Sequence, residues 1–169
     1  MKKMTYPSVL SIAGFDGSGG AGIQADLKTI SALGCYATTV LTALPVQNTT
    51  GVKSIFSIPV TVVEEQLKSI FDDILPSAIK IGMVHTPQLV ETIAKSLTEN
   101  PNIPVVFDPV MVATSGHKLI EDPTIKSIVT HLFQLASVIT PNMDEASLLA
   151  KMEVKSLEDM HTAGRKIMQ

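Results

Sequence analysis

Residues 8–26 read SVLSIAGFDGSGGAGIQAD and join a short apolar run, a glycine-rich loop and the start of an amphipathic segment. Val9 to Ala13 predicts a β-strand, because it is short, apolar and closed by Gly14. Residues 21–33 predict a helix, because large apolar side chains recur at helical spacing: Ile23, Leu27, Ile30 and Leu33. A strand, a loop and a helix in this order are typical of the opening of an α/β domain.

The rest of the chain repeats this alternation. Apolar or β-branched runs predict strands at 36–44, 78–84, 105–108 and 137–140, with 52–60 as a candidate strand at the sheet edge. Amphipathic runs predict helices at 61–75, from Pro87 onward, at 122–133 and from Asp144 onward. We therefore predict one α/β domain over residues 1–169 with a largely parallel sheet, which would bind ligands at the carboxyl ends of its strands.

Several of these helices begin with capping signals. Thr61 and Glu64 have the spacing of a capping box. Thr86 and Asp122 each precede a proline, which is favoured in the first helical turn. The helix at 61–75 is expected to bury one stripe of side chains: Val63, Leu67, Ile70 and Ile74.

Composition excludes several classes of protein. Hydrophobic residues make up 45% and charged residues 17% of the 169 positions, which excludes a disordered chain or a coiled coil. The net charge of −3 and the absence of a Lys/Arg cluster argue against nucleic acid as a partner. No apolar run approaches the roughly 20 residues of a membrane helix. A single cysteine, Cys35, excludes an internal disulfide framework and fits a reducing cytoplasm.

The glycine loop admits three interpretations. Gly17, Gly19 and Gly22 match the dinucleotide fingerprint G-x-G-x-x-G, but residues 27–57 lack the acidic residue that would hold the ribose. A Walker A loop is excluded because residues 14–22 contain no lysine. The favoured interpretation is a small-ligand site, where glycines let the backbone approach the ligand and the following helix presents free N–H groups.

Polar residues follow other predicted strands. Gln47 and Asn48 come after the second strand, and an amide can both donate to and accept from a heterocycle edge. Asp108 and Glu145 follow later strands, and Mg²⁺ prefers carboxylates, waters and phosphate oxygens. Helix capping is a competing interpretation for the acidic turn that begins at Asn142. An ordinary polar loop is a competing interpretation for residues 47–49.

Several segments resemble the hydroxymethylpyrimidine/phosphomethylpyrimidine kinases of the ribokinase-like superfamily. They are residues 13–26, the segment LPVQNT at 44–49, KIGM at 80–83, VVFDPV at 105–110 and the N-x-x-E pattern at 142–145. The resemblance runs from about Ser8 to the end of the chain. It implies a three-layer α/β/α fold with a mostly parallel central sheet, as in that superfamily.

The resemblance also assigns roles to residues. It implies four that bind the pyrimidine: Gly14, Asp26, Gln47 and Met83. It implies three that act in catalysis by managing Mg²⁺ and phosphate, with the first and last as metal ligands: Asp108, Asn142 and Glu145. Ser115-Gly116 matches the family pattern as well, whereas Pro45 departs from it at one wall of the pocket. Without the resemblance, Asp26 would be a first-turn helix acid and Met83 a core residue.

The implied function is ATP- and Mg²⁺-dependent phosphorylation of 4-amino-5-hydroxymethyl-2-methylpyrimidine and of its monophosphate, in thiamin biosynthesis. The expected partners are the pyrimidine and ATP, with neither nucleic acid nor membrane, and a homodimer is one option for the assembly. Pyridoxal or pyridoxine kinase is the alternative within the class, although Gln47 favours a ring that carries an amine. A catalytically silent pyrimidine-binding module is the alternative outside it.

The family's later segment is not found in these residues. Family members continue into a Gly-Thr-Gly motif that forms the anion hole for the transferred phosphate and holds the presumed catalytic cysteine. The last predicted helix, which starts after Ser156, runs to Gln169 with no stop signal. We therefore expect an N-terminal portion of a kinase with its C-terminal part missing, and little or no turnover by this chain alone.

Overall fold

The computed structural model describes residues 6–111 and 120–168. Its central sheet has five parallel strands in the order β2-β1-β5-β6-β7. In chain order they are β1 (Ser8–Ala13), β2 (Tyr36–Leu41), β5 (Ala78–Ile81), β6 (Val105–Phe107) and β7 (Val138–Ile139). The chain moves from β1 to one neighbour, β2, and later returns to the other, β5, so the order of the strands reverses beside β1.

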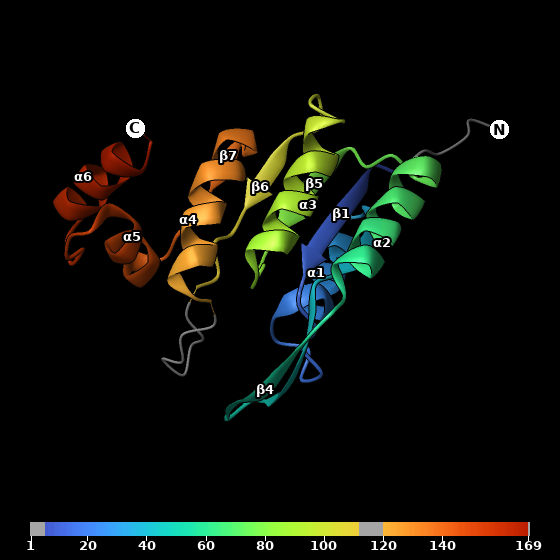
Figure 1. The fold of residues 1–169 in the computed structure, drawn as a ribbon, viewed down its shortest axis with the longest axis horizontal. Coiled ribbons are helices and arrows are strands. Elements are labelled where there is room, and N and C mark those ends of the chain that lie inside the picture. The colour runs from blue at the N-terminus through green and yellow to red at the C-terminus, as the bar shows by residue number, and fades with distance from the viewer. Residues whose placement is uncertain (1–5, 112–119, 169) are drawn as a thin grey trace.

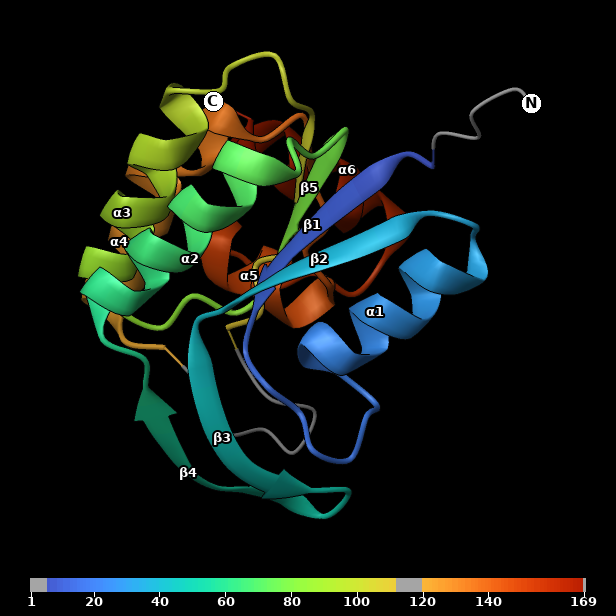
Figure 2. The same ribbon diagram turned by 90° about the vertical axis from the view of Figure 1, so that its right-hand side faces the viewer.

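Helices cover both faces of this sheet. In chain order they are α1 (Gly22–Ala32), α2 (Val60–Asp73), α3 (Pro87–Thr98), α4 (Asp122–His131), α5 (Met143–Ala150) and α6 (Leu157–Ile167), with a short 3₁₀ turn at Phe133–Leu135. Figure 2 shows α1 on one side of the strands and α2, α3 and α4 on the other. The predicted three-layer α/β/α arrangement with a mostly parallel sheet is confirmed. Helices α5 and α6 pack on each other at the β7 end of the molecule (Figure 1).

The main core lies between the sheet and helices α2 to α4. Strand residues Leu10, Ile81 and Phe107 are fully buried there, and they meet the buried stripe of α3. That stripe is Leu89, Val90, Ile93, Ala94 and Leu97. In α2, Val63 and Leu67 are buried as predicted, since an amphipathic helix buries the face that meets the sheet. No helix in the described part of the chain is long and apolar enough to cross a membrane.

The predicted run at 36–44 is divided between two sheets. β2 ends at Leu41, and β3 (Ala43–Asn48) pairs antiparallel with β4 (Gly51–Ser57) in a separate hairpin. The sequence prediction of one strand at 36–44 was therefore wrong, and so was the placing of residues 52–60 at the edge of the main sheet. The hairpin projects beyond the carboxyl ends of the parallel strands (Figures 1 and 2).

Two predicted caps differ in the structure, and one is confirmed. α2 begins at Val60 with Pro59 as the N-cap residue, so Thr61 lies inside the first turn and the predicted capping box was wrong. α4 begins at Asp122 itself, one residue after its N-cap Glu121. The Thr86 hydroxyl does cap α3, because it accepts the Leu89 N–H at 3.3 Å.

Candidate functional site

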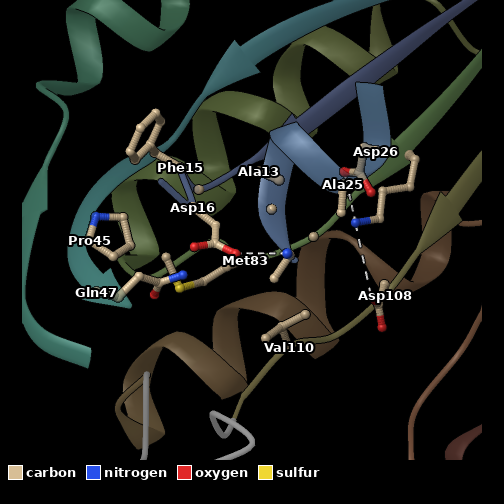
Figure 3. A pocket seen from close by; sticks show the side chains of 15 residues that line it. Ala13, Phe15, Asp16, Ala25, Asp26, Pro45, Gln47, Met83, Asp108 and Val110 are labelled. Atoms are coloured by element: carbon tan, nitrogen blue, oxygen red, sulfur yellow. Dashed lines mark hydrogen bonds and ion pairs between the residues drawn. The ribbon is translucent and has the colours of Figure 1, made fainter. Parts of the chain in front are cut away.

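A cavity of about 310 Å³ opens at the carboxyl ends of β1 and β5, where the strand order reverses. Ligands of open α/β sheets bind at such a switch point, because the loops that follow the two strands separate to opposite faces. Figure 3 shows the lining side chains, and the β3–β4 hairpin supplies one wall. The lining residues are Ala13, Gly14, Phe15, Asp16, Ala21, Gly22, Ala25, Asp26, Pro45, Gln47, Lys80, Gly82, Met83, Asp108 and Val110.

Gly22 lets the loop after β1 close against the start of α1. Its φ of +56° is rare for residues with a side chain, and a Cβ there would lie 2.3 Å from the Gly14 carbonyl oxygen. That carbonyl accepts the Ile23 N–H at 3.0 Å, which joins the end of β1 to the first turn of α1. At Gly14 itself a Cβ would lie 2.8 Å from the Met83 Cε atom, so the Met83 side chain occupies the space that Gly14 leaves free.

The Asp16 carboxylate holds the glycine loop together. Oδ1 accepts hydrogen bonds from Ser18 N at 3.0 Å and Ser18 Oγ at 2.7 Å. Oδ2 accepts hydrogen bonds from Gly20 N at 3.0 Å and Ala21 N at 2.8 Å. Burial alone would raise the pKa of Asp16, but hydrogen bonds from the Gln47 side chain, Ser18 and Ala21 outweigh burial and hold this pKa well below its ordinary value. The loop therefore closes around an ionised carboxylate.

Gln47 reaches the cavity from the hairpin. Gln47 shares the inward face of β3 with Ala43 and Pro45, because side chains alternate between the two faces of a strand. The register shift beside it leaves the extra residue, Lys53, on β4. Gln47 is half-buried and points toward Asp16 in Figure 3. Its neighbour Asn48 is exposed, and its side-chain oxygen accepts Thr50 N at 2.9 Å in the hairpin turn. Gln47 therefore faces the ligand space, and Asn48 shapes the turn.

Lys80 at the end of β5 places a positive charge between two carboxylates. Its Nζ lies 3.0 Å from Asp26 Oδ2 and 4.0 Å from Asp108 Oδ2. The Ser11 hydroxyl donates to the same Asp26 oxygen at 2.6 Å. The three charged side chains come from three elements that meet only in the fold: α1, β5 and the loop after β6.

The structure brings five of the seven predicted site residues around this one cavity: Gly14, Asp26, Gln47, Met83 and Asp108. Asn142 and Glu145 do not line it, and they form the capping box of α5, with Glu145 N 3.0 Å from Asn142 Oδ1. Ser115-Gly116 lies outside the described residues.

Glu145 ties α5 to the segment after β6, which contains Asp108. Its Oε2 accepts Asn142 N at 2.9 Å and its Oε1 accepts Met111 N at 3.3 Å. Burial raises the pKa of Glu145, and the neighbouring charges of Asp108 and Asp144 raise it further. Glu145 thus anchors the segment after β6, close enough to Asp108 for their charges to interact.

These residues fit a magnesium ion only in a restricted way. Among residues 6–111 and 120–168, no group of three or more His, Cys, Asp or Glu side chains is arranged to hold a metal. Mg²⁺ that accompanies a nucleotide usually takes one or two carboxylates, with waters and phosphate oxygens as its other ligands. Asp108, whose side chain is 39% exposed, fits the carboxylate of such a site, and Glu145 fits as a group behind it.

Sequence reasoning assigned no role to Asp16, Lys80 or Ser11. Asp16 and Lys80 lie within segments that matched the family. The sequence does not indicate which groups a carboxylate in a glycine loop or a lysine on a strand will contact. Ser11 looked like an ordinary strand residue, and only its contact with Asp26 marks it. The signal that was available was the clustering of polar residues at strand ends.

Together, the fold and this cavity define a ribokinase-like α/β domain with a cavity at its switch point. The description of the matching family model is phosphomethylpyrimidine kinase, and the match covers residues 16–169. The chain belongs to this family.

Three similar proteins place the chain more closely. It is 44% identical over 163 residues to a hydroxymethylpyrimidine/phosphomethylpyrimidine kinase of Staphylococcus aureus, covering 96% of this chain and 59% of that protein. The crystal structure of the phosphomethylpyrimidine kinase of Clostridium difficile 630 superposes with a TM-score of 0.89 at 40% identity, over 96% of this chain and 71% of that one. The pyridoxal kinase of Bacillus subtilis superposes with a TM-score of 0.86 at 38% identity, over 97% and 61%.

The chain spans only part of its relatives. It covers 59–62% of the length of the curated hydroxymethylpyrimidine/phosphomethylpyrimidine kinases that it matches. It covers 33% of a bifunctional thiamine biosynthesis protein from Geobacter sulfurreducens.

Proposed function

We propose that the protein carrying this chain transfers the γ-phosphate of ATP to the hydroxymethyl group of 4-amino-5-hydroxymethyl-2-methylpyrimidine, and then phosphorylates the monophosphate. The observation that carries the proposal is the cavity at the switch point, whose volume of about 310 Å³ suits one small heterocycle. Its lining combines one amide, apolar surface and three carboxylates, two of which are bridged by a lysine. The apolar surface suits the faces of a planar ring, and the polar groups suit the ring's polar edge and its alcohol.

The ring would lie beside Gly14 and Met83. Gly14 presents backbone without a side chain, and the Met83 thioether, 8% exposed, offers a polarisable contact for an aromatic ring. Gln47 would read the edge that carries the amine, since an amide offers both an acceptor and a donor. Asp26 has its Oδ2 occupied by Ser11 and Lys80, which leaves Oδ1 as the oxygen that would accept from the ligand.

The phosphate would approach from the Asp108 side. The alcohol oxygen attacks the γ-phosphorus, and the bond between the γ-phosphorus and the oxygen that bridges it to the β-phosphate breaks. ADP leaves, and the alcohol proton is released. Mg²⁺, when bound with ATP, would neutralise phosphate charge, with Asp108 as its carboxylate and Asn142 and Glu145 holding the segment behind it. Lys80 keeps Asp26 and Asp108 from adding uncompensated negative charge beside the incoming phosphates.

Isothermal titration with the unphosphorylated pyrimidine tests the pocket. The expected result is binding that weakens about tenfold or more in Gln47→Ala, because a buried hydrogen bond is lost. Asn48→Ala is the matched control, since it removes an amide one residue away that faces solvent, and it should bind like the parent. Equal weakening in both variants would show that the hairpin is merely destabilised and would refute the role of Gln47.

The reaction is tested by ATP-dependent phosphorylation with the whole protein that carries this chain, with the pyrimidine and pyridoxal compared as substrates and the product mass measured. A pyrimidine phosphate formed faster than pyridoxal phosphate is expected. The similarity to the Bacillus subtilis pyridoxal kinase makes the reverse preference the informative failure, because it would keep the fold and the phosphate chemistry but replace the substrate.

A further inference from the structure

The β3–β4 hairpin joins the domain at two roots, and hydrogen bonds fix these roots unequally. At the β3 root, Thr42 N donates to the Ala13 carbonyl at 3.0 Å. Phe15 N donates to the Ala43 carbonyl at 2.9 Å. The Thr42 hydroxyl donates to the Met83 carbonyl at 2.8 Å, and this contact is buried. The β3 root is therefore tied by three hydrogen bonds to residues that line the cavity.

The β4 root is tied through His85. Ser57 is the last residue of β4, and its Oγ lies 2.6 Å from His85 Nε2. The backbone contact at this root is long, since Ile58 N lies 3.5 Å from the Thr42 carbonyl oxygen. His85 belongs to the segment after β5, two residues beyond Met83. One short segment thus carries both a lining residue of the cavity and the anchor of the hairpin.

The second nitrogen of the His85 ring is enclosed. His85 is half-buried between the hairpin and the starts of α3 and α4, where it lines a second cavity with Ile55, Thr86 and Thr124. The Thr124 hydroxyl donates to the His85 carbonyl at 3.4 Å. Nδ1 is buried and has no hydrogen-bond partner among the described residues. The ring is therefore paired at Nε2 alone.

This environment selects one neutral form of the ring. A neutral imidazole carries its proton on one nitrogen, and a buried N–H without an acceptor is costly. A proton on Nε2 is paired with Ser57 Oγ, whereas a proton on Nδ1 would have no acceptor. Nε2–H therefore donates to Ser57 Oγ, and Nδ1 stays unprotonated. A charged ring would need a proton on both nitrogens, so this position disfavours it.

We propose that His85 is a positioning residue: in its neutral form it holds the β4 root of the hairpin through Ser57, and so keeps the hairpin wall of the cavity in place for the ligand. The inference rests on the proposed function, because it concerns how that pocket is closed. Pro45 and Gln47, which line the cavity from the hairpin, lie between the two roots. Without the His85 contact the hairpin can turn about its β3 root, and the apparent affinity falls with the fraction of closed molecules.

Protonation of His85 should release the β4 root. Burial lowers the pKa of His85 below its ordinary value of 6.5, so the contact is complete above pH 6.5 and weakens progressively as the pH falls below it. The charged side chains on the surrounding elements are Lys53 on β4, Glu121 before α4 and Asp122 in its first turn, while residues 86–90 at the start of α3 carry none. Of these three, Glu121 lines the same cavity as His85.

Titration of the whole protein that carries this chain with 4-amino-5-hydroxymethyl-2-methylpyrimidine tests the contact. His85→Gln keeps a donor near the position of Nε2 but has no charged form. At about pH 7.5 the parent and His85→Gln should bind within about twofold of each other. At about pH 5.5 the parent should bind about three- to tenfold more weakly than His85→Gln. Comparing the two proteins at the same pH cancels any protonation of the ligand. A ratio that is the same at both pH values would overturn the proposal.

Two truncations remove the contact from either end. His85→Ala and Ser57→Ala should each weaken binding about three- to tenfold at about pH 7.5. The double variant should lose no more than either single one, because the same hydrogen bond is removed. The matched controls are His131→Gln, at the end of α4, and Ser54→Ala, on the same strand as Ser57; both residues are exposed, and both variants should bind like the parent. Additive losses in the double variant, or equal losses in the controls, would contradict a link between His85 and Ser57.

Hydrogen exchange of the hairpin amides tests the contact without a ligand. At about pH 5.5 the amides of residues 51–57 should exchange about threefold or more faster in the parent than in His85→Gln, with equal rates at about pH 7.5. Equal rates at both pH values would show that His85 does not hold the hairpin. If the pyrimidine does not bind the parent, the proposed function fails, and the exchange comparison still decides the role of His85.

Discussion

Replacing Lys80 with methionine should destabilise the chain by about 2 kcal/mol, because it leaves the Asp26 carboxylate without its cation. At an effective dielectric constant of about 20, two charges 3.0 Å apart attract by roughly 5 kcal/mol, most of which is offset by the lost hydration of both groups. Fully buried pairs lose about 3–5 kcal/mol when one partner is removed, and exposed pairs about 1 kcal/mol or less. The Lys80 and Asp26 side chains are 26% and 17% exposed, which places this pair between the two limits.

Urea unfolding followed by circular dichroism measures this change as a shift of the midpoint at constant slope. Lys95→Met is the matched control, since the Lys95–Glu64 pair has a similar separation of 3.3 Å but side chains that are 66% and 53% exposed. That control should lose less than about 0.5 kcal/mol.

A double variant distinguishes the loss of the ion pair from any other effect of the methionine at position 80. In Asp26→Asn/Lys80→Met the carboxylate is neutral as well, so about half or more of the lost stability should return. The reasoning fails if Lys80→Met matches Lys95→Met, or if the double variant is no more stable than the single one.

Three further changes test other parts of the structure. Gly22→Ala should lower the unfolding free energy by about 1–3 kcal/mol or more in thermal melting, because φ is +56° and the new Cβ would meet the Gly14 carbonyl. Ile93→Ala should cost about 2–5 kcal/mol in urea unfolding, since Ile93 is fully buried, whereas Leu33→Ala, at a side chain 75% exposed, should change it by less than about 0.5 kcal/mol. Folding lowers the pKa of Asp16, so its carboxylate stabilises the folded chain at pH values above its ordinary pKa of 3.8. This stabilisation is progressively lost as the pH falls below 3.8. Acid unfolding followed by circular dichroism should therefore be steeper below about pH 4 for the parent than for Asp16→Asn, and equal slopes would contradict it.

The alternation of strands and helices was predictable because each element carries its own burial pattern. The apolar run before Gly14 became β1, and the amphipathic run from Pro87 became α3 with its Thr86 cap. Errors arose where the partner of a segment decided its structure. The run at 36–44 is uniformly β-prone, and its division at Thr42 reflects the hydrogen bonds that Thr42 makes to Ala13 and Met83 across the sheet.

The candidate site was predictable mainly where a family motif marked it. Asp26, Gln47 and Met83 were named from such motifs, and the structure places them around one cavity. The composition of their segments would have left each as a helix acid, a loop amide or a core methionine. Lys80 was missed because its partners, Asp26 and Asp108, are distant in the sequence. Asp16 was missed although its hydrogen-bond donors lie within five positions of it in the glycine loop.

Local chemistry was therefore enough to determine the class of fold, the position of the glycine loop and the edge of the sheet at which the cavity lies. Helical spacing, β-branched runs and glycine at a positive φ act over a few residues, so they can be read along the chain. The tertiary structure alone decided that β3 and β4 leave the main sheet, that Lys80 stands between two carboxylates, and that Gln47 lines the cavity beside Asp16. Those features depend on distances between groups far apart in the chain, and only folding sets such distances.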